Sequence, residues 1–393
     1  MAPVPRVYEV ASYAVSFGAY YAFAQLSRSL RLDQRKGLLG ALARAFVGHE
    51  SLATGGPKDD KKEEAKEDSK GVRALKLLFC IAGIKVSYLC WGIMQERIMT
   101  RPYGDGPDAE SFSSSKFLVF ANRVVALLVA DAAVRFNREA PDGAPPYRFS
   151  YCATSNIVSS VCQYEALKYV SFPTQVLAKS CKMLPVMIMA FVVSRKAYPA
   201  ADWAVALAVT GGVLVFKMSG AKGGAAGGGA GDVALELLGY ALIVGYMAFD
   251  SFTSNWQEAL FTEYKPSSFR MMRQVNLFST TFTAMGLLLT LEAVSVPQFL
   301  ARHPDCAQHV VLMALCSAVG QLFIFTTIKE FGALVFATVN TVRQMLSVVL
   351  SFAVFGHAIT TGQASGIAVV FGSLAAQVAI KWRRSAQKKH KKQ

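Results

Sequence analysis

From Leu75 onwards the chain is a succession of apolar stretches, each about as long as a helix that crosses a bilayer. Roughly 20 residues, at a rise of about 1.5 Å each, cover the hydrocarbon core. Lipid offers the backbone no hydrogen-bond partners, so stretches of this kind form α-helices. The sequence therefore predicts an all-α, polytopic membrane protein with a ten-helix core, at about residues 75–95, 117–136, 149–170, 173–194, 201–219, 235–258, 271–291, 308–328, 333–355 and 362–381.

The composition is also that of a membrane protein. Of the 393 residues, 53% are hydrophobic and only 17% are charged, unlike a soluble chain of this length. The formal net charge of +15 resides largely in tails and short loops, without a basic and aromatic module outside the apolar stretches. We therefore expect a lipid bilayer as partner and no nucleic acid. The cysteines lack metal-binding spacings, and we expect no disulfide, although Cys306 is predicted to lie in a loop.

The N-terminal segment, residues 1–74, differs from the rest. A moderately apolar run at 8–30 is either a spanning or an interfacial helix, and it lacks the basic start and cleavage site of a signal peptide. Charges of both signs then crowd residues 55–71, a composition typical of a disordered linker, here predicted to be cytosolic.

A glycine-rich connector at 220–234 divides the core into a first five-helix half, 75–219, and a second, 235–382, followed by a basic tail at 383–393. Lys and Arg are enriched in short connections on the cytosolic side of a membrane. Their bias here favours a cytosolic tail. The cytosolic connections would then carry Arg135, Arg138, Arg148, Arg195, Lys196, Lys265, Arg270 and Lys329.

An internal repeat relates the two halves. Residues 172–189, FPTQVLAKSCKMLPVMIM, align without a gap with 331–348, FGALVFATVNTVRQMLSV, and a stretch with Gln163 or Gln321 precedes each. An odd number of helices in each half makes the halves inverted in the membrane, as in many secondary transporters. The repeat therefore predicts alternating access, with a substrate site near the midplane where the halves meet.

Two lysines lie near the middle of the fourth stretch, Lys179 and Lys182, three residues apart and so on one helix face. A lysine at mid-bilayer costs a few kcal/mol, so it usually faces a cavity or a partner. The stretch itself contains no carboxylate, which favours a cavity that holds an anion. The alternative is an ion pair with Asp250 or Glu165.

Several strings resemble the nucleotide-sugar transporter family of the drug/metabolite transporter superfamily. They are KLLFCIAGIKVSYLCWGIMQERIMTRPYG, QYEALKYVSFPTQVLAKSCKMLPVM, GYMAFDSFTSNWQEALF and CSAVGQLFIFTTIKEFGALVFATVNTVRQMLSVVLS. The chain is most similar to the members that carry 3′-phosphoadenosine 5′-phosphosulfate (PAPS). The resemblance implies an antiporter of the Golgi membrane that imports PAPS into the lumen in exchange for a nucleotide product. A plant branch associated with UDP-galactose and UDP-glucose implies the alternative substrate.

The resemblance also bears on residues in the second half. Arg343, in the ninth stretch, matches a Thr-x-Arg element of the family and is expected to contact phosphate, with Asn340 about one turn earlier on the same face. Arginine suits phosphate because its guanidinium makes bidentate contacts, whereas lysine acts as a point charge. Asn340 and Lys85 depart from the family pattern. We include both as substrate-site residues.

The remaining predicted site residues carry open alternatives. Arg123 contacts the substrate or snorkels to the interface, and Lys85 contacts a further phosphate or pairs with a carboxylate. Gln163 and Tyr164 bind the base or belong to the helix core. For Asp250 we favour an ion-pair anchor for one of the two central lysines over a ribose contact or proton coupling.

Other functional classes fit less well. The five histidines are scattered, so neither an enzyme nor a metal site is expected, and no cofactor is implied. An exporter of cationic drugs would need central carboxylates. Lys389 and Lys391 resemble a coat-protein retrieval signal for cycling between Golgi and endoplasmic reticulum, or else form an ordinary basic tail. The sequence leaves a homodimer open.

Overall fold

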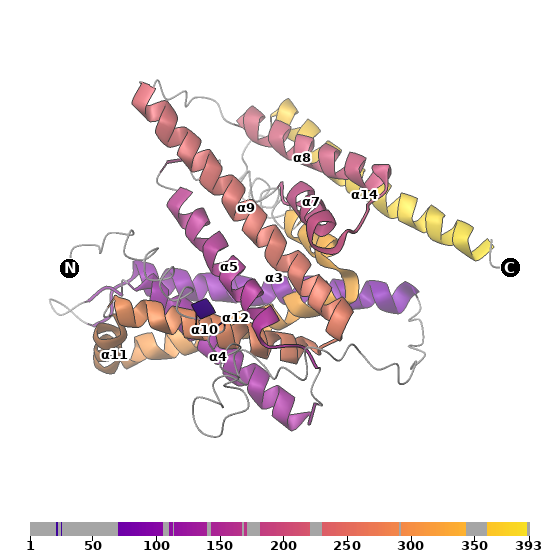
Figure 1. The fold of residues 1–393 in the computed structure, drawn as a ribbon. Helices are drawn as coiled ribbons and strands as arrows, with labels where there is room; N and C mark the ends of the chain where they lie inside the picture. Colours follow the sequence, from indigo (N-terminus) through magenta and orange to yellow (C-terminus); the bar gives the residue numbers. More distant parts are fainter. Residues whose placement is uncertain are drawn as a thin grey trace. The chain divides into compact units, whose positions relative to one another are not determined.

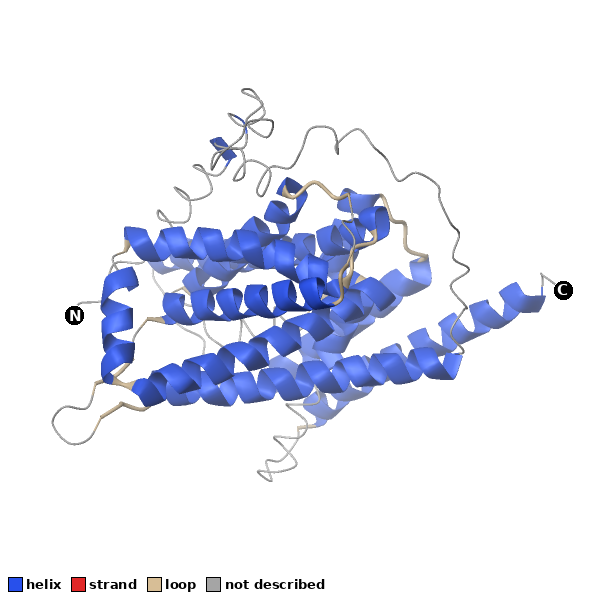
Figure 2. Cartoon of the chain, turned by 90° about the horizontal axis from the view of Figure 1, so that it is seen from below, coloured by secondary structure: helices blue, strands red, loops and turns tan. Residues whose placement is uncertain are grey.

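The computed structural model describes residues 70–104, 110–112, 114–139, 143–166, 169–170, 181–220, 230–290, 292–342 and 360–390, together with Tyr21, Ala22 and Gln25. Within these ranges the ordered elements are helices, and Figure 2 draws no strand among them. A single isolated bridge pairs Tyr103 with Glu110 there. The predicted all-α class is therefore confirmed for the described part of the chain. Nearly all of the predicted segment 8–30 and the charged linker lie outside it.

The described helices follow the predicted stretches closely (Figure 1). A further helical segment, Ala333–Val342, begins the ninth stretch. The labelled helices are α3 (Lys70–Thr100), α4 (Ser115–Phe136), α5 (Tyr147–Ala166), α7 (Met183–Ser194), α8 (Ala200–Gly220), α9 (Ala230–Tyr264), α10 (Ser268–Leu289), α11 (Glu292–Arg302), α12 (Pro304–Phe331) and α14 (Thr361–His390).

Four of the described helices, α3, α4, α9 and α12, are long and apolar enough to cross a membrane. The bent pair α10 and α11 makes a fifth if it is taken as one span. Shorter apolar helices occupy the fourth, fifth, ninth and tenth predicted stretches. The chain is thus a polytopic membrane protein, and the full number of ten spans stays a prediction.

The chain divides into two compact units. The first comprises residues 1–157 and 257–331, and the second comprises 158–256 and 332–393. The division falls within α5 and α9, and each unit takes helices from both halves of the sequence. The predicted halves describe the order of the repeat along the chain, a separate property that stays a prediction.

In the first unit, α3 packs along α12, and α4 packs against α10 and α12. Glycines let α3 and α12 approach closely. The ring of Phe323 on α12 fills the space where Gly83 would carry a side chain, and a Cβ at Gly320 would lie 2.7 Å from Cε2 of Tyr88. Small residues of this kind allow helices to pack tightly where lipid supplies no hydrophobic driving force.

The sequence analysis missed α11, whose residues were predicted to be a connection. α11 lies at 93° to α10, and its apolar side chains at three- and four-residue spacing pack into a cluster with Tyr103 and Phe112. The helix is too short to span a membrane and contains Pro297, so a search for spanning stretches passes over it. Cys306 was predicted wrongly as well, because α12 begins at Pro304 and buries it in the same cluster.

In the second unit, α8 and α14 lie side by side (Figure 1). Gly362 and Gly366 form a GxxxG spacing on α14, and Gly366 faces the backbone of α8: an added Cβ would lie 2.6 Å from the carbonyl oxygen of Gly212. The core of this unit joins α7, α8, α14 and the segment Ala333–Val342 through buried Met183, Met187, Ala206, Val213, Ala337 and Val370.

Candidate anion-binding site

The candidate site begins at the N-terminus of α7. Lys182 is the residue that immediately precedes this helix, and Pro185 lies in its first turn. Proline is tolerated there because its missing N–H would have no partner within the helix. The first N–H groups of α7 and the positive end of its dipole therefore lie next to a lysine. Buried Met183, Val186, Met187 and Ala190 hold the helix in the core of the second unit.

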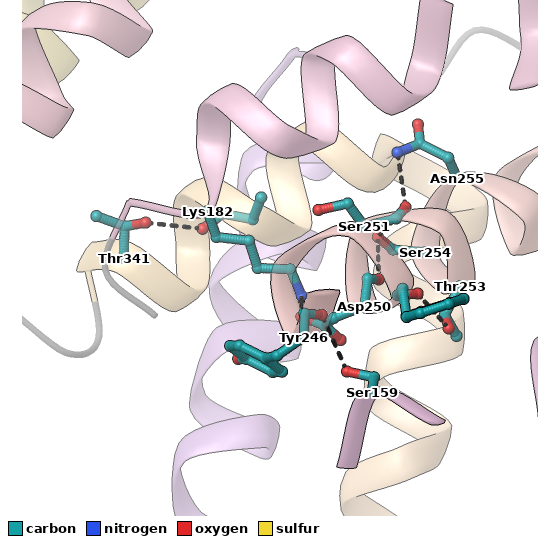
Figure 3. A network of polar contacts seen from close by, with 11 residues as sticks. Ser159, Lys182, Tyr246, Asp250, Ser251, Thr253, Ser254, Asn255 and Thr341 are labelled. Atoms are coloured by element: carbon teal, nitrogen blue, oxygen red, sulfur yellow. Dashed lines mark hydrogen bonds and ion pairs between the residues drawn. The ribbon is translucent and has the colours of Figure 1, made fainter. Parts of the chain in front are cut away.

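Lys182 forms an ion pair with Asp250 of α9. Its Nζ lies 2.5 Å from Oδ2 of Asp250, and the two side chains are 11% and 24% exposed (Figure 3). The ammonium also lies 5.3 Å from the ring centroid of Phe336, a cation–π distance. Removing a buried charge's partner is costly, so the carboxylate stabilises the lysine in these apolar surroundings. The ion pair that we favoured for Asp250 is present in the structure. Its role as an anchor and substrate contact by Lys182 both stay predictions.

Hydrogen bonds fix α9 around the ion pair. Asn255 donates from Nδ2 to the carbonyl oxygen of Val186 on α7, at 3.0 Å, and to that of Ser251, at 2.9 Å. From α5, the Ser159 hydroxyl donates to the carbonyl oxygen of Tyr246, at 3.2 Å. The tethered positions, Tyr246 and Asn255, lie on either side of Asp250 along α9. Figure 3 shows the bond of Ser159 to Tyr246 and that of Asn255 to Ser251. They hold the carboxylate of α9 and the N-terminus of α7 in a defined relation.

The polar residues after Asp250 bond to their own helix. The Thr253 hydroxyl donates to the carbonyl oxygen of Phe249, and that of Ser254 donates to the carbonyl oxygens of Asp250 and Ser251. Their hydrogens are already donated, so the ion pair is the charged feature of this part of α9.

The structure describes some of the other predicted site residues of the second unit and leaves others out. Gln163 on α5 and Asn340 in the segment Ala333–Val342 are partly buried, and Tyr164 lies on α5 with its side chain outside the described atoms. Lys179 and Arg343 lie outside the described residues. The convergence of these positions with Lys182 therefore stays a prediction.

Two predicted residues belong to the first unit. Arg123 on α4 is partly buried and donates from Nη2 to Oδ1 of Asn156 on α5, at 2.7 Å, so its guanidinium is directed towards another helix. Lys85 lies on α3, also partly buried. In the same unit, buried Asn276 donates to Oε1 of Gln321, at 2.6 Å. Each unit thus places amide or charged groups inside apolar helices.

A model of the UAA transporter family matches residues 76–381, most of the chain and nearly all of its predicted core. The chain belongs to the UAA transporter family. This UAA transporter is 44% identical over 376 residues to adenosine 3'-phospho 5'-phosphosulfate transporter 1 of Homo sapiens, a match that covers 95% of this chain and 86% of the relative. The transporter of that name in Drosophila melanogaster is 40% identical over 330 residues, a match that covers 82% of this chain and 70% of the relative.

Relatives with another substrate in their names are also similar. The UDP-galactose/UDP-glucose transporter 5 of Arabidopsis thaliana is 38% identical over 323 residues, which cover 82% of this UAA transporter and 92% of the relative. A solved structure shares the fold with a TM-score of 0.54 at 14% sequence identity, covering 77% of this chain and 98% of its own. The family assignment and the helical structure together make this chain a multi-pass membrane transporter.

The sequence analysis missed the residues that position the charged pair of this UAA transporter. Asn255 and Ser159 tether α9 near Asp250, and Phe336 lies beneath the Lys182 ammonium, but none was among the predicted site residues. A weak signal was available for Asn255, because an amide inside an apolar helix needs a partner. Phe336 carries no such signal, since an aromatic ring in an apolar helix is an ordinary core residue.

The first unit has a second polar cluster, at the start of α4 and in the loop before it. Lys116 and Ser114, at the start of α4, both bond the carboxylate of Glu292 on α11. Arg302 bonds Glu110 at 2.7 Å, which holds the pKa of that carboxyl below its usual range. Burial, followed by the nearby Cys306, raises the pKa of Tyr103 to about 12. These contacts attach α11 to the start of α4 and to the loop between α3 and α4.

Proposed function

We propose that this protein is an antiporter that carries PAPS from the cytosol into the Golgi lumen in exchange for a nucleotide product, adenosine 3′,5′-bisphosphate. The observation that carries the proposal is the 44% identity to the human adenosine 3'-phospho 5'-phosphosulfate transporter 1 over 95% of the chain. A similarity of this extent includes the spans on which a substrate site depends, and it fits the cationic centre read from the sequence.

The proposed site is a cationic centre that binds the phosphosulfate and the 3′-phosphate. Such a substrate brings several negative charges into a low-dielectric region, so more than one cation is needed. Lys182 at the N-terminus of α7 supports the proposal, because a helix N-terminus favours anions through its free N–H groups and its dipole. We propose that Lys179 and Arg343 complete the cationic centre. Asn340, Arg123, Lys85, Gln163 and Tyr164 are proposed as further contacts.

The transport mechanism proposed is alternating access by a ten-helix core of two inverted repeats. Two packed pairs support this arrangement: α4 with α10, and α8 with α14. They are the predicted second and seventh helices, and the fifth and tenth, which hold equivalent places in the two halves. A two-fold axis within the membrane brings equivalent helices together in this way.

We further propose that the protein transports without a catalytic step, that it lies in the Golgi membrane, and that its C-terminus is cytosolic. Coat proteins would recognise Lys389 and Lys391 during cycling with the endoplasmic reticulum. Replacing both lysines with Ala tests this part: the protein should then leave the early secretory compartments. An unchanged distribution would count against the retrieval signal and leave the transport proposal intact.

The second candidate function is UDP-sugar transport, favoured by the 38% identity that covers 92% of the Arabidopsis UDP-galactose/UDP-glucose transporter. A transport assay with purified protein in liposomes distinguishes the two candidate functions. Vesicles loaded with adenosine 3′,5′-bisphosphate should take up labelled PAPS, whereas vesicles loaded with UMP should not take up labelled UDP-galactose. Uptake of PAPS driven only by UMP, or of UDP-galactose alone, would overturn the first proposal.

Single substitutions test the cationic centre. We expect Lys179→Gln, Lys182→Gln and Arg343→Gln each to weaken nucleotide binding on the order of tenfold or more, as expected for the loss of a hydrogen bond to a charged group. Lys329→Gln is the matched control, because Lys329 is an exposed residue in the last turn of α12. Binding that survives all three substitutions would remove these residues from the site.

A further inference from the structure

We infer that Asp250 is a counter-ion that substrate displaces from Lys182, so that the anion and the carboxylate compete for one ammonium group. This inference rests on the proposed function, since it assigns a positioning and regulatory role at the same site. It goes beyond an anchoring role because it predicts that the carboxylate opposes substrate binding.

The argument starts from the geometry of the ion pair. Oδ2 of Asp250 lies 2.5 Å from the ammonium of Lys182, within direct hydrogen-bond distance. A phosphate at this ammonium would lie close to the carboxylate, and two like charges at such a distance in a low-dielectric region repel strongly. An anion therefore binds Lys182 well only when the carboxylate gives way.

The surroundings allow the carboxylate, rather than the lysine, to move. The Lys182 side chain is 11% exposed and lies over the ring of Phe336, while the shorter Asp250 side chain is 24% exposed. The ring contact persists when the ion pair opens, so it keeps the ammonium in place. Tyr246 lies one helical turn before Asp250 on α9, and Figure 3 shows it beside the pair.

The backbone of both helices resists larger movement. Asn255 ties α9 to the first turn of α7, and Ser159 ties α9 to α5. Exchange of one anion for another at the ammonium therefore needs only a side-chain rotation of Asp250. In the empty transporter the pair is neutral, and the charge of Lys182 becomes available to the substrate as the carboxylate leaves.

The test is the direction in which Asp250→Asn changes affinity. Without the competing charge, we expect labelled PAPS to bind roughly tenfold more tightly, a factor that corresponds to about 1.4 kcal/mol. Exchange in liposomes should show a lower KM and a lower maximal rate, because bound nucleotide leaves more slowly. Asp250→Glu should keep near wild-type values.

A matched control is Asp131→Asn, which removes a carboxylate paired with Arg135 and Arg273 in the first unit. It should leave the affinity unchanged. The thermal stability of the Asp250→Asn protein, with and without nucleotide, is also measured: the empty protein should unfold earlier than wild type, and nucleotide should raise its unfolding temperature by more than it raises that of wild type.

Weaker PAPS binding by Asp250→Asn, with Lys182→Gln also weaker, would overturn the counter-ion role and make Asp250 a structural or direct substrate contact. A smaller nucleotide-induced thermal shift would do the same. By contrast, wild-type protein that binds neither PAPS nor adenosine 3′,5′-bisphosphate, or a Lys182→Gln variant with wild-type affinity, would show that the proposed function itself fails.

Discussion

Replacing Gly366 with Ala should destabilise the second unit although alanine is the better helix former. The new Cβ would lie 2.6 Å from the carbonyl oxygen of Gly212, 2.7 Å from the amide nitrogen of Phe216 and 2.8 Å from its Cβ. Two of these atoms belong to the backbone of α8, so no side chain can rotate to make room. Ordinary contact begins at 3.4 Å, which means that α8 and α14 must separate by about 0.8 Å at this point.

The magnitude follows from two opposing effects. Overpacking of a tight interface typically costs about 1–3 kcal/mol, and a gap of about 0.5–1 Å forfeits a quarter to a half of each contact energy along the interface. The higher helix propensity of Ala offsets up to about 1 kcal/mol of this cost. The net expectation is a loss of about 1–2 kcal/mol, which corresponds to a fall of several degrees in unfolding temperature.

Gly372 offers a control on the same helix. Nothing lies within 4 Å of a Cβ built at Gly372, so only the propensity effect remains and Gly372→Ala should be neutral or slightly stabilising. The assay measures thermal unfolding of the two variants and of wild type in the same detergent. The readout is the fraction of protein that stays monodisperse after heating. The reasoning fails if Gly366→Ala unfolds at or above the wild-type temperature, or if both variants change alike.

Two further predictions concern the polar cluster at α11. Glu292→Gln should lower the free energy of unfolding by about 1–3 kcal/mol, because it deprives Lys116, only 8% exposed, of a carboxylate at 2.9 Å. Replacing Lys116 and Glu292 together with Met should lower the unfolding temperature by less than Glu292→Gln does. An equal fall would contradict the argument that the two charges depend on each other. Tyr103 keeps its proton more tightly in the folded than in the unfolded protein, because burial raises its pKa from an ordinary value of about 10 to about 12. Its contribution to stability is therefore present below about pH 10 and lost as the pH rises towards 12. Unfolding temperatures measured across this range should fall less steeply for Tyr103→Phe than for wild type, and parallel curves would refute the assignment.

The helical class and most helix positions were predictable because an apolar stretch in lipid has few alternatives to a helix. α12 covers the predicted stretch 308–328 and extends beyond it at both ends. The prediction failed for α11, whose apolar residues face the protein on one side only. A hydropathy search detects helices that are apolar on every side. A short amphipathic helix is instead stabilised by its neighbours, here Tyr103 and Phe112.

The site was predicted in part. Lys182 stood out in the sequence because a charge inside an apolar helix needs a partner, and Asp250 was one of the two carboxylates named for it. The local sequence offered Glu165 as an equal partner, and only the packing of α7 against α9 selects Asp250. Phe336 lies more than 150 positions from Lys182 along the chain, so no local pattern could have joined them.

By itself, the sequence determined that this chain folds into membrane helices and that it belongs with transporters, and it predicts a cationic centre. Those properties depend on composition and on the spacing of residues within single helices. The tertiary structure alone decided which carboxylate neutralises Lys182, where glycines permit close packing, and how α11 attaches to the first unit. Such properties depend on contacts between helices distant in sequence, and distances of a few ångströms between side chains decide their energies.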